Sequence, residues 1–240
     1  MIRALIGVPT FVVATILGSI GALLAGMIDK SGDLVMVLAR LWSRVVLGAP
    51  GVQVEVKAHA ALDPKRPYVF MPNHASMVDI WALFLAVPIQ FRFIAKKQLG
   101  AIPLFGWAMR AGRFIFIDRQ NPASARRSID EAARRIKAGQ SVVIFPEGTR
   151  TRDGKLGSFK KGGFHLAVDS GADIVPVAIR GSHEVMPPGS ALMRAGKVTV
   201  ELAAPISTAG LGRHDREPLM NRVRAEIAAM LSEASSRSAP

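Results

Sequence analysis

The chain has 240 residues, half of them hydrophobic, and a formal net charge of +13 at pH 7; this length is sufficient for one substantial packed domain with an appendage. A basic and apolar composition indicates anionic partners such as phospholipid headgroups, an acidic carrier protein or nucleic acid. Nucleic acid is disfavoured because basic residues are not interleaved with aromatic ones. The absence of cysteine excludes disulfides, thiolate nucleophiles and cysteine-ligated zinc.

The N-terminal segment is predicted to anchor the chain to a membrane. Ala4 to Ile28 is a long run without a charge, and a helix of that length can cross a hydrocarbon core of about 30 Å. Its glycines and Pro9 are tolerated in a helix surrounded by lipid. A cleaved signal peptide is the alternative, but its apolar region would contain only about 7 to 15 residues. The anchor is therefore preferred.

A second helix is predicted from Leu34 to Leu47, with an apolar stripe on one side and Arg40, Ser43 and Arg44 opposite. Because Trp42 and the arginines suit the headgroup level, this helix could lie in the membrane boundary. It could equally cover the core of the following domain. Whether the two helices span the bilayer or enter one leaflet stays open.

After residue 51 the pattern changes to alternating strands and helices. The strand candidates are Val52–Val56, Tyr68–Met71, Phe91–Ala95, Phe114–Ile117, Val142–Phe145, Ile174–Ile179 and Val198–Leu202. The helix candidates are Ser76–Ala86, Leu104–Ala111, Ala123–Lys137, Gly163–Ser170 and Arg216–Ser232, with a frayed end after residue 234. This order predicts an α/β domain, a mixed sheet covered by helices, over residues 49–240. Residues 1–48 are expected to form the membrane-anchoring helices.

The stretch Asn73-His74-Ala75-Ser76-Met77-Val78-Asp79 places a histidine and a carboxylate five residues apart, where a strand gives way to a helix. On one regular helix the two side chains would be about 140° apart and could not meet. Ser76 and Asp79 match a capping box, which predicts a helix start near Ser76 and leaves His74 on the preceding loop. His74 could then act as a base oriented by Asp79 and activate a hydroxyl group. The alternative is a plain helix cap with His74 packed in the core.

A second group of polar residues, Glu147-Gly148-Thr149-Arg150, follows a predicted strand. Gly148 permits close backbone approach, Thr149 offers a hydroxyl and Arg150 offers a planar fork of donors. This combination is suited to holding a phosphomonoester. The alternative is an ordinary glycine turn in a solvated basic loop, which is preferred only for the lysines at 155, 160 and 161.

Motifs for other chemistries are absent from the sequence. The five histidines lack the spacing of zinc-binding pairs, and neither a Walker loop nor G-x-G-x-x-G occurs, so no metal and no nucleotide cofactor is predicted. The nucleophile elbow G-x-S-x-G of serine hydrolases is missing as well.

The two motifs together resemble the glycerolipid acyltransferase family, whose members carry N-H-x-x-x-x-D followed by F-P-E-G-T-R. Intermediate elements are similar to the family's K-x-L, P-x-x-G and G-x-x-F-I-D-R, and a weaker fourth block follows. These elements are Lys96–Leu99, Ile102–Trp107, Gly112–Arg119 and Ile174–Ile179. The resemblance covers roughly residues 50 to 205.

The resemblance implies transfer of a fatty acyl group from a thioester, on coenzyme A or acyl carrier protein, to the 2-hydroxyl of 1-acylglycerol-3-phosphate (lysophosphatidate). The product would be phosphatidate, in phospholipid biosynthesis. His74 would take the hydroxyl proton while Asp79 holds the imidazole. The oxyanion would be stabilised by backbone amides at the Gly148 turn or at the helix after His74. No covalent intermediate and no cofactor would be needed.

By the same resemblance, the acceptor phosphate would be held by the turn at residues 148–150, by Lys97 and by Arg119. Glu147 would bond the glycerol hydroxyl or brace Arg150, and these alternatives stay open. Asp118 and Arg119 could instead form a structural ion pair at a strand end.

The resemblance also implies a bacterial protein at the inner (cytoplasmic) membrane, with its catalytic domain on the cytoplasmic side and the phospholipid bilayer as a partner. Three other readings stay open. The acceptor could be a different lysolipid, such as a lyso-ornithine lipid or a lysophospholipid with a larger headgroup. The protein could bind anionic lipid without catalysis, or it could pass the acyl group to water as a hydrolase.

Overall fold

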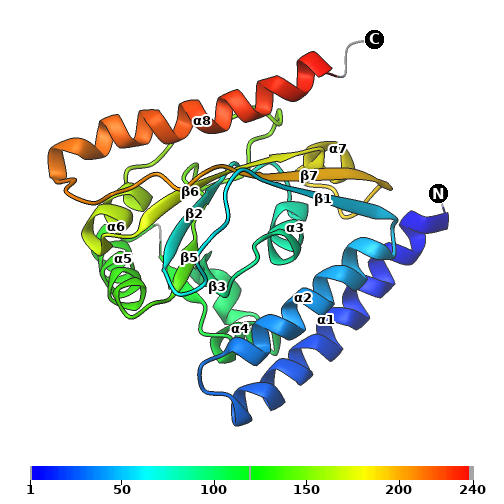
Figure 1. Cartoon of the computed structure of the whole chain (residues 1–240). Coiled ribbons are helices and arrows are strands. Elements are labelled where there is room, and N and C mark those ends of the chain that lie inside the picture. The colour runs from blue at the N-terminus through cyan, green and yellow to red at the C-terminus, as the bar shows by residue number, and fades with distance from the viewer. Residues whose placement is uncertain (1, 119, 238–240) are drawn as a thin grey trace.

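A seven-stranded sheet forms the centre of the fold in the computed structural model, which describes residues 2–118 and 120–237 (Figure 1). The strands are β1 (Val52–Ala58), β2 (Tyr68–Pro72), β3 (Phe91–Lys96), β4 (Ile115–Ile117), β5 (Ser141–Val143), β6 (Asp173–Arg180) and β7 (Gly196–Leu202). They lie in the order β1-β7-β6-β2-β5-β3-β4, with β6 and β7 antiparallel and all other neighbours parallel. The predicted mixed sheet is therefore confirmed.

Helices cover both faces of this sheet (Figure 1). They are α1 (Ile2–Ile28), α2 (Asp33–Gly48), α3 (Val78–Ala86), α4 (Phe105–Ala111), α5 (Pro122–Lys137), α6 (Gly162–Ser170), α7 (Ser182–Val185) and α8 (Arg216–Arg237), with 3₁₀ turns η1 (Lys97–Ala101) and η2 (Arg213–Asp215). Helices α1 to α4 lie on one side, and α5, α6 and α8 on the other. Because both faces are covered, β2, β5 and β6 are almost wholly buried, which explains their continuous apolar runs.

Several predicted boundaries differ from the observed ones, and the ends of β5 and α8 are two of them. Strand β5 ends at Val143 rather than at Phe145, although the N–H of Ile144 still donates to Phe70 O of β2 at 3.0 Å. Helix α8 continues to Arg237, past its predicted end at Ser232 and through part of the segment expected to fray.

Helix α1 approaches the rest of the protein at points from Gly7 to Gly26. A methyl group added at Gly7 would lie 3.8 Å from Pro50 Cβ, and one at Gly26 would lie only 2.7 Å from Ala111 Cβ on α4. Between them, Gly18 faces Trp42 of α2 at 3.7 Å. Among the described helices, α1 alone is long and apolar enough to cross a membrane, over Gly7–Ile28. A soluble core helix or a signal sequence can share that composition.

Helix α2 has two apolar faces; the inner one covers the core, as one of the two predictions expected, and the predicted position at the membrane boundary stays a prediction. Its inner face contributes Met36, Val46 and Leu47 to the same buried cluster as the sheet. Its outer face leaves four apolar side chains exposed, namely Leu34, Val37, Leu41 and Val45. The predicted polar side was partly wrong, because Ser43 is buried and donates to Ala39 O. The functional division at residue 48 stays a prediction.

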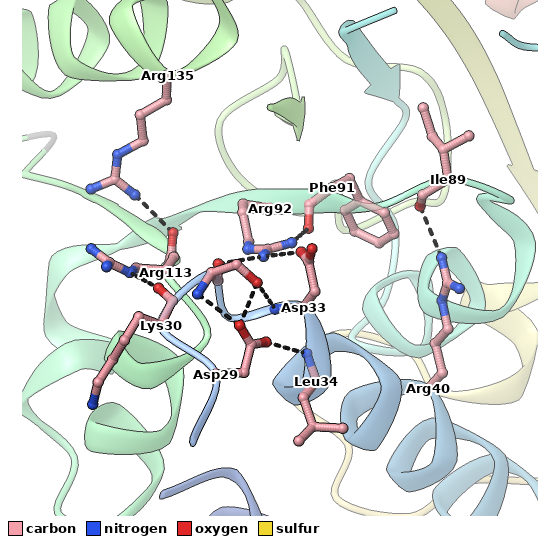
Figure 2. Close-up of polar contacts among 11 residues, drawn as sticks. Asp29, Lys30, Asp33, Leu34, Arg40, Ile89, Phe91, Arg92, Arg113 and Arg135 are labelled. Carbon is pink, nitrogen blue, oxygen red and sulfur yellow. Dashed lines mark hydrogen bonds and ion pairs between the residues drawn. The ribbon is translucent and has the colours of Figure 1, made fainter. Parts of the chain in front are cut away.

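The turn between α1 and α2 is closed by Asp29 (Figure 2). Its Oδ2 accepts the backbone N–H of Leu34 at 2.7 Å, and its Oδ1 accepts both the N–H and the hydroxyl of Ser31. The Leu34 amide, followed by the Ser31 hydroxyl, lowers the pKa of Asp29 to about 2. The carboxylate thus supplies the acceptor that the start of α2 needs.

The same turn is attached to the sheet by a buried arginine. Arg92 of β3 is only 1% exposed and donates to Ser31 O at 3.0 Å, to Phe91 O and to Asp33 Oδ1 at 2.8 Å (Figure 2). These bonds satisfy most of a guanidinium that has left water. The helix pair is therefore fixed to the sheet at the turn as well as through its apolar face.

Candidate active site

The two motifs meet because their loops leave the same edge of the sheet. Strands β2, β5 and β3 are neighbours and run parallel. His74 follows the carboxyl end of β2, the Glu147–Arg150 turn follows β5, and Lys96 ends β3. In open α/β sheets, ligands bind at this edge.

The predicted contact between His74 and Asp79 is present. His74 Nδ1 lies 2.8 Å from Asp79 Oδ2, and the Asp79 side chain is fully buried while that of His74 is 14% exposed. Asp79 Oδ2 also accepts the N–H groups of Ala75 and Ser76 at 2.8 and 2.9 Å. Because a carboxylate only accepts, Nδ1 carries the proton and Nε2 is left as the basic nitrogen.

The predicted start of the helix was wrong by two residues, because α3 begins at Val78. Only half of the capping box forms, in which Asp79 accepts the N–H of Ser76. The Ser76 hydroxyl instead accepts the N–H of Val78 and donates to Met186 O at 2.6 Å, so it is held across the fold. His74 nevertheless lies on the loop before the helix, as predicted.

Glu147 connects the two motifs through backbone groups. Its Oε1 accepts the N–H of His74 at 2.7 Å and its Oε2 accepts the N–H of Gly157 at 2.8 Å. Burial raises the pKa of Glu147, against the lowering effect of these two N–H donors. Within the described chain Glu147 makes no hydrogen bond or ion pair with Arg150, so the brace is not seen. A contact with the acceptor stays a prediction.

Two further contacts hold the loop of His74 in place. The N–H of Thr151 donates to His74 O at 2.9 Å. The Phe145 ring stacks on the imidazole, with centroids 3.8 Å apart and planes inclined by 20°. Both backbone groups and one face of His74 are thus fixed by the second motif.

Asn73 ties the same loop to β6. Its Nδ2 donates to Ile179 O at 3.0 Å and its Oδ1 accepts the N–H of Ile179 at 2.7 Å. The amide side chain therefore replaces a backbone pair where β2 has ended beside β6. These two bonds therefore help to fix the position of His74, the next residue along the loop.

One cavity of about 490 Å³ brings both motifs together. His74 and the Gly148–Arg150 turn line it, and the remaining lining is mostly apolar, from α1, α2, α3, α4 and β3. Among these apolar residues are Ala22, Leu38, Trp42, Trp81, Phe84 and Met109. A polar group at the loops and an alkyl chain among the helices would both be accommodated.

The predicted cations differ in their placement. Arg150 lines the cavity, and within the part of the chain that the structure describes its guanidinium makes no hydrogen bond or ion pair. The Lys97 side chain is 65% exposed and lies outside the cavity lining, with its Nζ 3.3 Å from Asp118 Oδ2. The pKa of Asp118 is lowered first by the hydrogen bond from the N–H of Gln120 and next by the one from Lys97. Arg119 lies outside the described residues, so its role and its predicted pairing stay predictions.

Some of the backbone amides at the two predicted oxyanion positions are already engaged in the structure. The N–H of Gly148 donates to Phe145 O at 3.1 Å, and the first amides after His74 donate to Asp79. Two lining residues, Met77 and Thr149, have backbone amides that donate no hydrogen bond among residues 2–118 and 120–237. Met77 is also the N-cap of α3, where an anion is favoured.

Several supporting residues were missed at the level of sequence. Lys96 lines the cavity in place of its neighbour Lys97, and the alternation of side chains along β3 could have separated the two. Thr151 follows the second motif directly, but its partner is 77 residues away. Gly157 gave no signal, because its role is that of a backbone donor.

Comparison with known proteins identifies the family. Residues 53–180 match the Acyltransferase family model. A chloroplastic 1-acyl-sn-glycerol-3-phosphate acyltransferase of Arabidopsis thaliana is 34% identical over 80% of this chain and 52% of its own length. The Saccharomyces cerevisiae 1-acyl-sn-glycerol-3-phosphate acyltransferase is 30% identical over 90% of this chain and 72% of its own length.

A solved structure extends the likeness over the whole chain. The crystal structure of the 1-acyl-sn-glycerophosphate acyltransferase PlsC from Thermotoga maritima matches with a TM-score of 0.84 and 26% identity, covering 100% of this chain and 99% of that one. The chain spans about half the length of the plant relatives it matches. The match of the family model to more than half of the chain, over the segment that carries both motifs, shows that this protein belongs to the acyltransferase family.

Proposed function

We propose that the protein is a 1-acylglycerol-3-phosphate O-acyltransferase, which moves a fatty acyl group from acyl-CoA or acyl-ACP to the 2-hydroxyl of lysophosphatidate and yields phosphatidate. The single observation that carries this proposal is the shared cavity, in which an oriented histidine, an unpaired arginine and a long apolar lining occur together. The relatives named above support the same activity.

In the proposed mechanism, His74 Nε2 takes the proton of the acceptor hydroxyl as its oxygen attacks the thioester carbonyl. The imidazolium that forms is stabilised by Asp79, which is already hydrogen-bonded to Nδ1. The tetrahedral oxyanion is placed at the free amides of Met77 and Thr149. Its collapse expels the thiolate, which receives the proton from His74. The steps need neither a covalent enzyme intermediate nor a cofactor.

The acceptor phosphate is placed at Arg150, with the Thr149 hydroxyl beside it. An unpaired guanidinium at the rim of an apolar cavity matches a phosphomonoester carried by an acyl chain. Lys97, Arg119 and Lys96 would add positive charge near this point. The apolar lining would hold the acyl chains, with about 0.8 kcal/mol gained for each methylene that leaves water.

Helices α1 and α2 are proposed to attach the protein to one leaflet. Residues near both ends of α1 contact the folded domain, at Pro50 and at Ala111. A bilayer crossing would carry α4 and the edge of the sheet into the hydrocarbon, where loop backbone groups cannot be satisfied. Exposed apolar faces on both helices suit shallow insertion instead. Attachment to a bacterial inner membrane from the cytoplasmic side is part of this proposal.

The deciding experiment compares wild type with His74→Ala for thiol release and phosphatidate formation from acyl-CoA and lysophosphatidate. Loss of the base should reduce kcat by roughly 10²–10⁴-fold without unfolding the protein. His214→Ala is the matched control, because His214 is exposed outside the cavity, and it should keep full activity. Near-normal turnover by His74→Ala would reject the base assignment. Free fatty acid in place of phosphatidate would indicate a hydrolase.

A second substitution tests the acceptor. Arg150→Ala should mainly raise KM for lysophosphatidate, because the lost charge faces the phosphate. An acceptor panel of lysophosphatidate, lysophosphatidylglycerol and lyso-ornithine lipid gives the measurement. An equal loss on acceptors without a phosphomonoester would contradict the phosphate role and favour another lysolipid as the natural acceptor.

A further inference from the structure

A second open cleft, of about 530 Å³, lies between α4 and α5 and is separate from the cavity of His74. Its charged lining consists of four arginines and one glutamate, a net charge of +3; these are Arg110, Arg113, Arg127, Arg135 and Glu131. The glutamate bonds Arg135 and also Arg134, which is outside the lining. The positive charge of the cleft is therefore poorly balanced by its own acid.

Most donors of these arginines make no hydrogen bond to the described part of the chain. Arg127 makes no hydrogen bond or ion pair within the described ranges, 2–118 and 120–237. Arg110 donates once, to Gly100 O, while its guanidinium lies 5.2 Å from the centroid of the Phe116 ring. A guanidinium has five N–H donors. Both side chains thus have donors available for an anion in the cleft.

The position of the cleft is set by the turn between α1 and α2. Arg113 Nε donates to Lys30 O at 2.9 Å, and Arg135 donates to Arg113 O at 2.9 Å (Figure 2). Just before that turn, Met27 and Ile28 are 72% and 82% exposed at the end of α1. The arginines therefore lie beside the apolar end of the helix that is proposed to enter the membrane.

The exposed residues of helix α4 also indicate that the cleft lies next to the membrane surface. Trp107 is 56% exposed and lies three residues before Arg110, so both side chains share one face of α4. Exposed tryptophan favours the headgroup level of a bilayer, and arginine reaches from there toward phosphate. An apolar and aromatic edge thus lies next to a cationic cleft.

We propose that this cleft binds the phosphate of an anionic phospholipid headgroup in the leaflet that holds α1 and α2, at a site distinct from the acceptor site. The proposal uses the membrane placement given under the proposed function, but not the acyl transfer. A soluble phosphate would match the arginines alone. A lipid matches both the arginines and the adjacent apolar surface, because its phosphate is joined to acyl chains.

The test is sedimentation of the full chain with phosphatidylcholine vesicles, with and without phosphatidylglycerol. Wild type should bind more tightly when phosphatidylglycerol is present. Arg127→Gln should weaken this gain about fivefold, and Arg110→Gln/Arg127→Gln by an order of magnitude or more. Arg127 is exposed and makes no hydrogen bond or ion pair among the described residues, so the single variant tests binding with little effect on folding.

The matched control is Arg222→Gln/Arg224→Gln, which removes the same charge from exposed positions on α8, on the other side of the sheet (Figure 1). This control variant should still bind more tightly when phosphatidylglycerol is present. If both double variants lost this increase in binding equally, general charge attraction would explain the result and the proposal would be overturned. Displacement by inorganic phosphate, but not by chloride at the same ionic strength, would assign the cleft to soluble phosphate and also overturn it. If the membrane placement of α1 and α2 were wrong, the result would be different again, because wild type would then not bind vesicles of pure phosphatidylcholine either.

Discussion

At the scale of single residues, Asp79 has the most demanding position in the site. One of its oxygens accepts three N–H groups, from the ring of His74 and from the amides of Ala75 and Ser76. Its other oxygen, Oδ1, is buried without a partner in the described part of the chain. The carboxylate thus sets both the path of the loop and the tautomer of the base. One substitution can remove its charge and keep its shape, and another can remove both.

Asp79→Asn should retain the loop but lose most activity. The amide oxygen can take the place of Oδ2 and keep the three hydrogen bonds, while the NH₂ group enters the unpartnered position and costs about 1–3 kcal/mol of stability. Without a negative charge beside it, the imidazolium is less stable, and kcat should fall roughly 10²–10⁴-fold.

Asp79→Ala serves as the comparison for shape, because it leaves all three donors without an acceptor. It should lower the free energy of unfolding by more than Asp79→Asn does, as measured by urea denaturation. Equal activity of Asp79→Asn and wild type would show that orientation alone is sufficient and that charge is not needed.

At the scale of elements, local signals predicted most of the strands and helices. The strands read as apolar runs because helices cover both faces of the sheet. The apposition of both motifs follows from parallel strands that end at one edge. The residues that hold the loops together were not predictable, because their partners are distant. His74 and Glu147 are 73 residues apart, and Asn73 and Ile179 are 106 apart.

Glu147→Gln tests the connection between the two loops. A glutamine has a single acceptor oxygen, so the N–H of either His74 or Gly157 would lose its partner. The variant should lose about 1–3 kcal/mol of stability. Where the N–H of His74 is the group that loses its partner, the loop of His74 is no longer fixed at both backbone groups, and activity should fall as well.

The pH dependence of stability gives a second readout for Glu147. Burial raises its pKa in the folded state, so folding takes up a proton between the unfolded and folded pKa values. Its contribution to stability is therefore full below the unfolded pKa, about 4.3, and is lost as pH rises through the folded pKa. Urea denaturation from about pH 4 upward should show this decline in wild type relative to Glu147→Gln. Parallel curves would contradict the assignment.

At the scale of the whole molecule, the cavity lies between the sheet and the two helices that are proposed to face the membrane. Its lining includes Ala22 of α1 and Leu38 of α2, while the outer faces of the same helices are exposed and apolar. The same two helices thus form a wall of the cavity and, under the proposed membrane attachment, the surface toward lipid. An acyl chain could pass from the leaflet to His74 without crossing water.

This arrangement predicts that both ends of the helix pair face the same side of the membrane. Because the chain has no cysteine, Lys30→Cys at the turn and Gly48→Cys at the far end of α2 provide single labelling sites at exposed positions. In sealed vesicles with protein added from outside, a membrane-impermeant maleimide should label both at similar rates before lysis. If the pair spanned the bilayer, Lys30→Cys would be labelled only after lysis while Gly48→Cys reacted at once. The bond from Arg113 to Lys30 O argues for the first outcome, since it holds the turn against the same domain that follows Gly48.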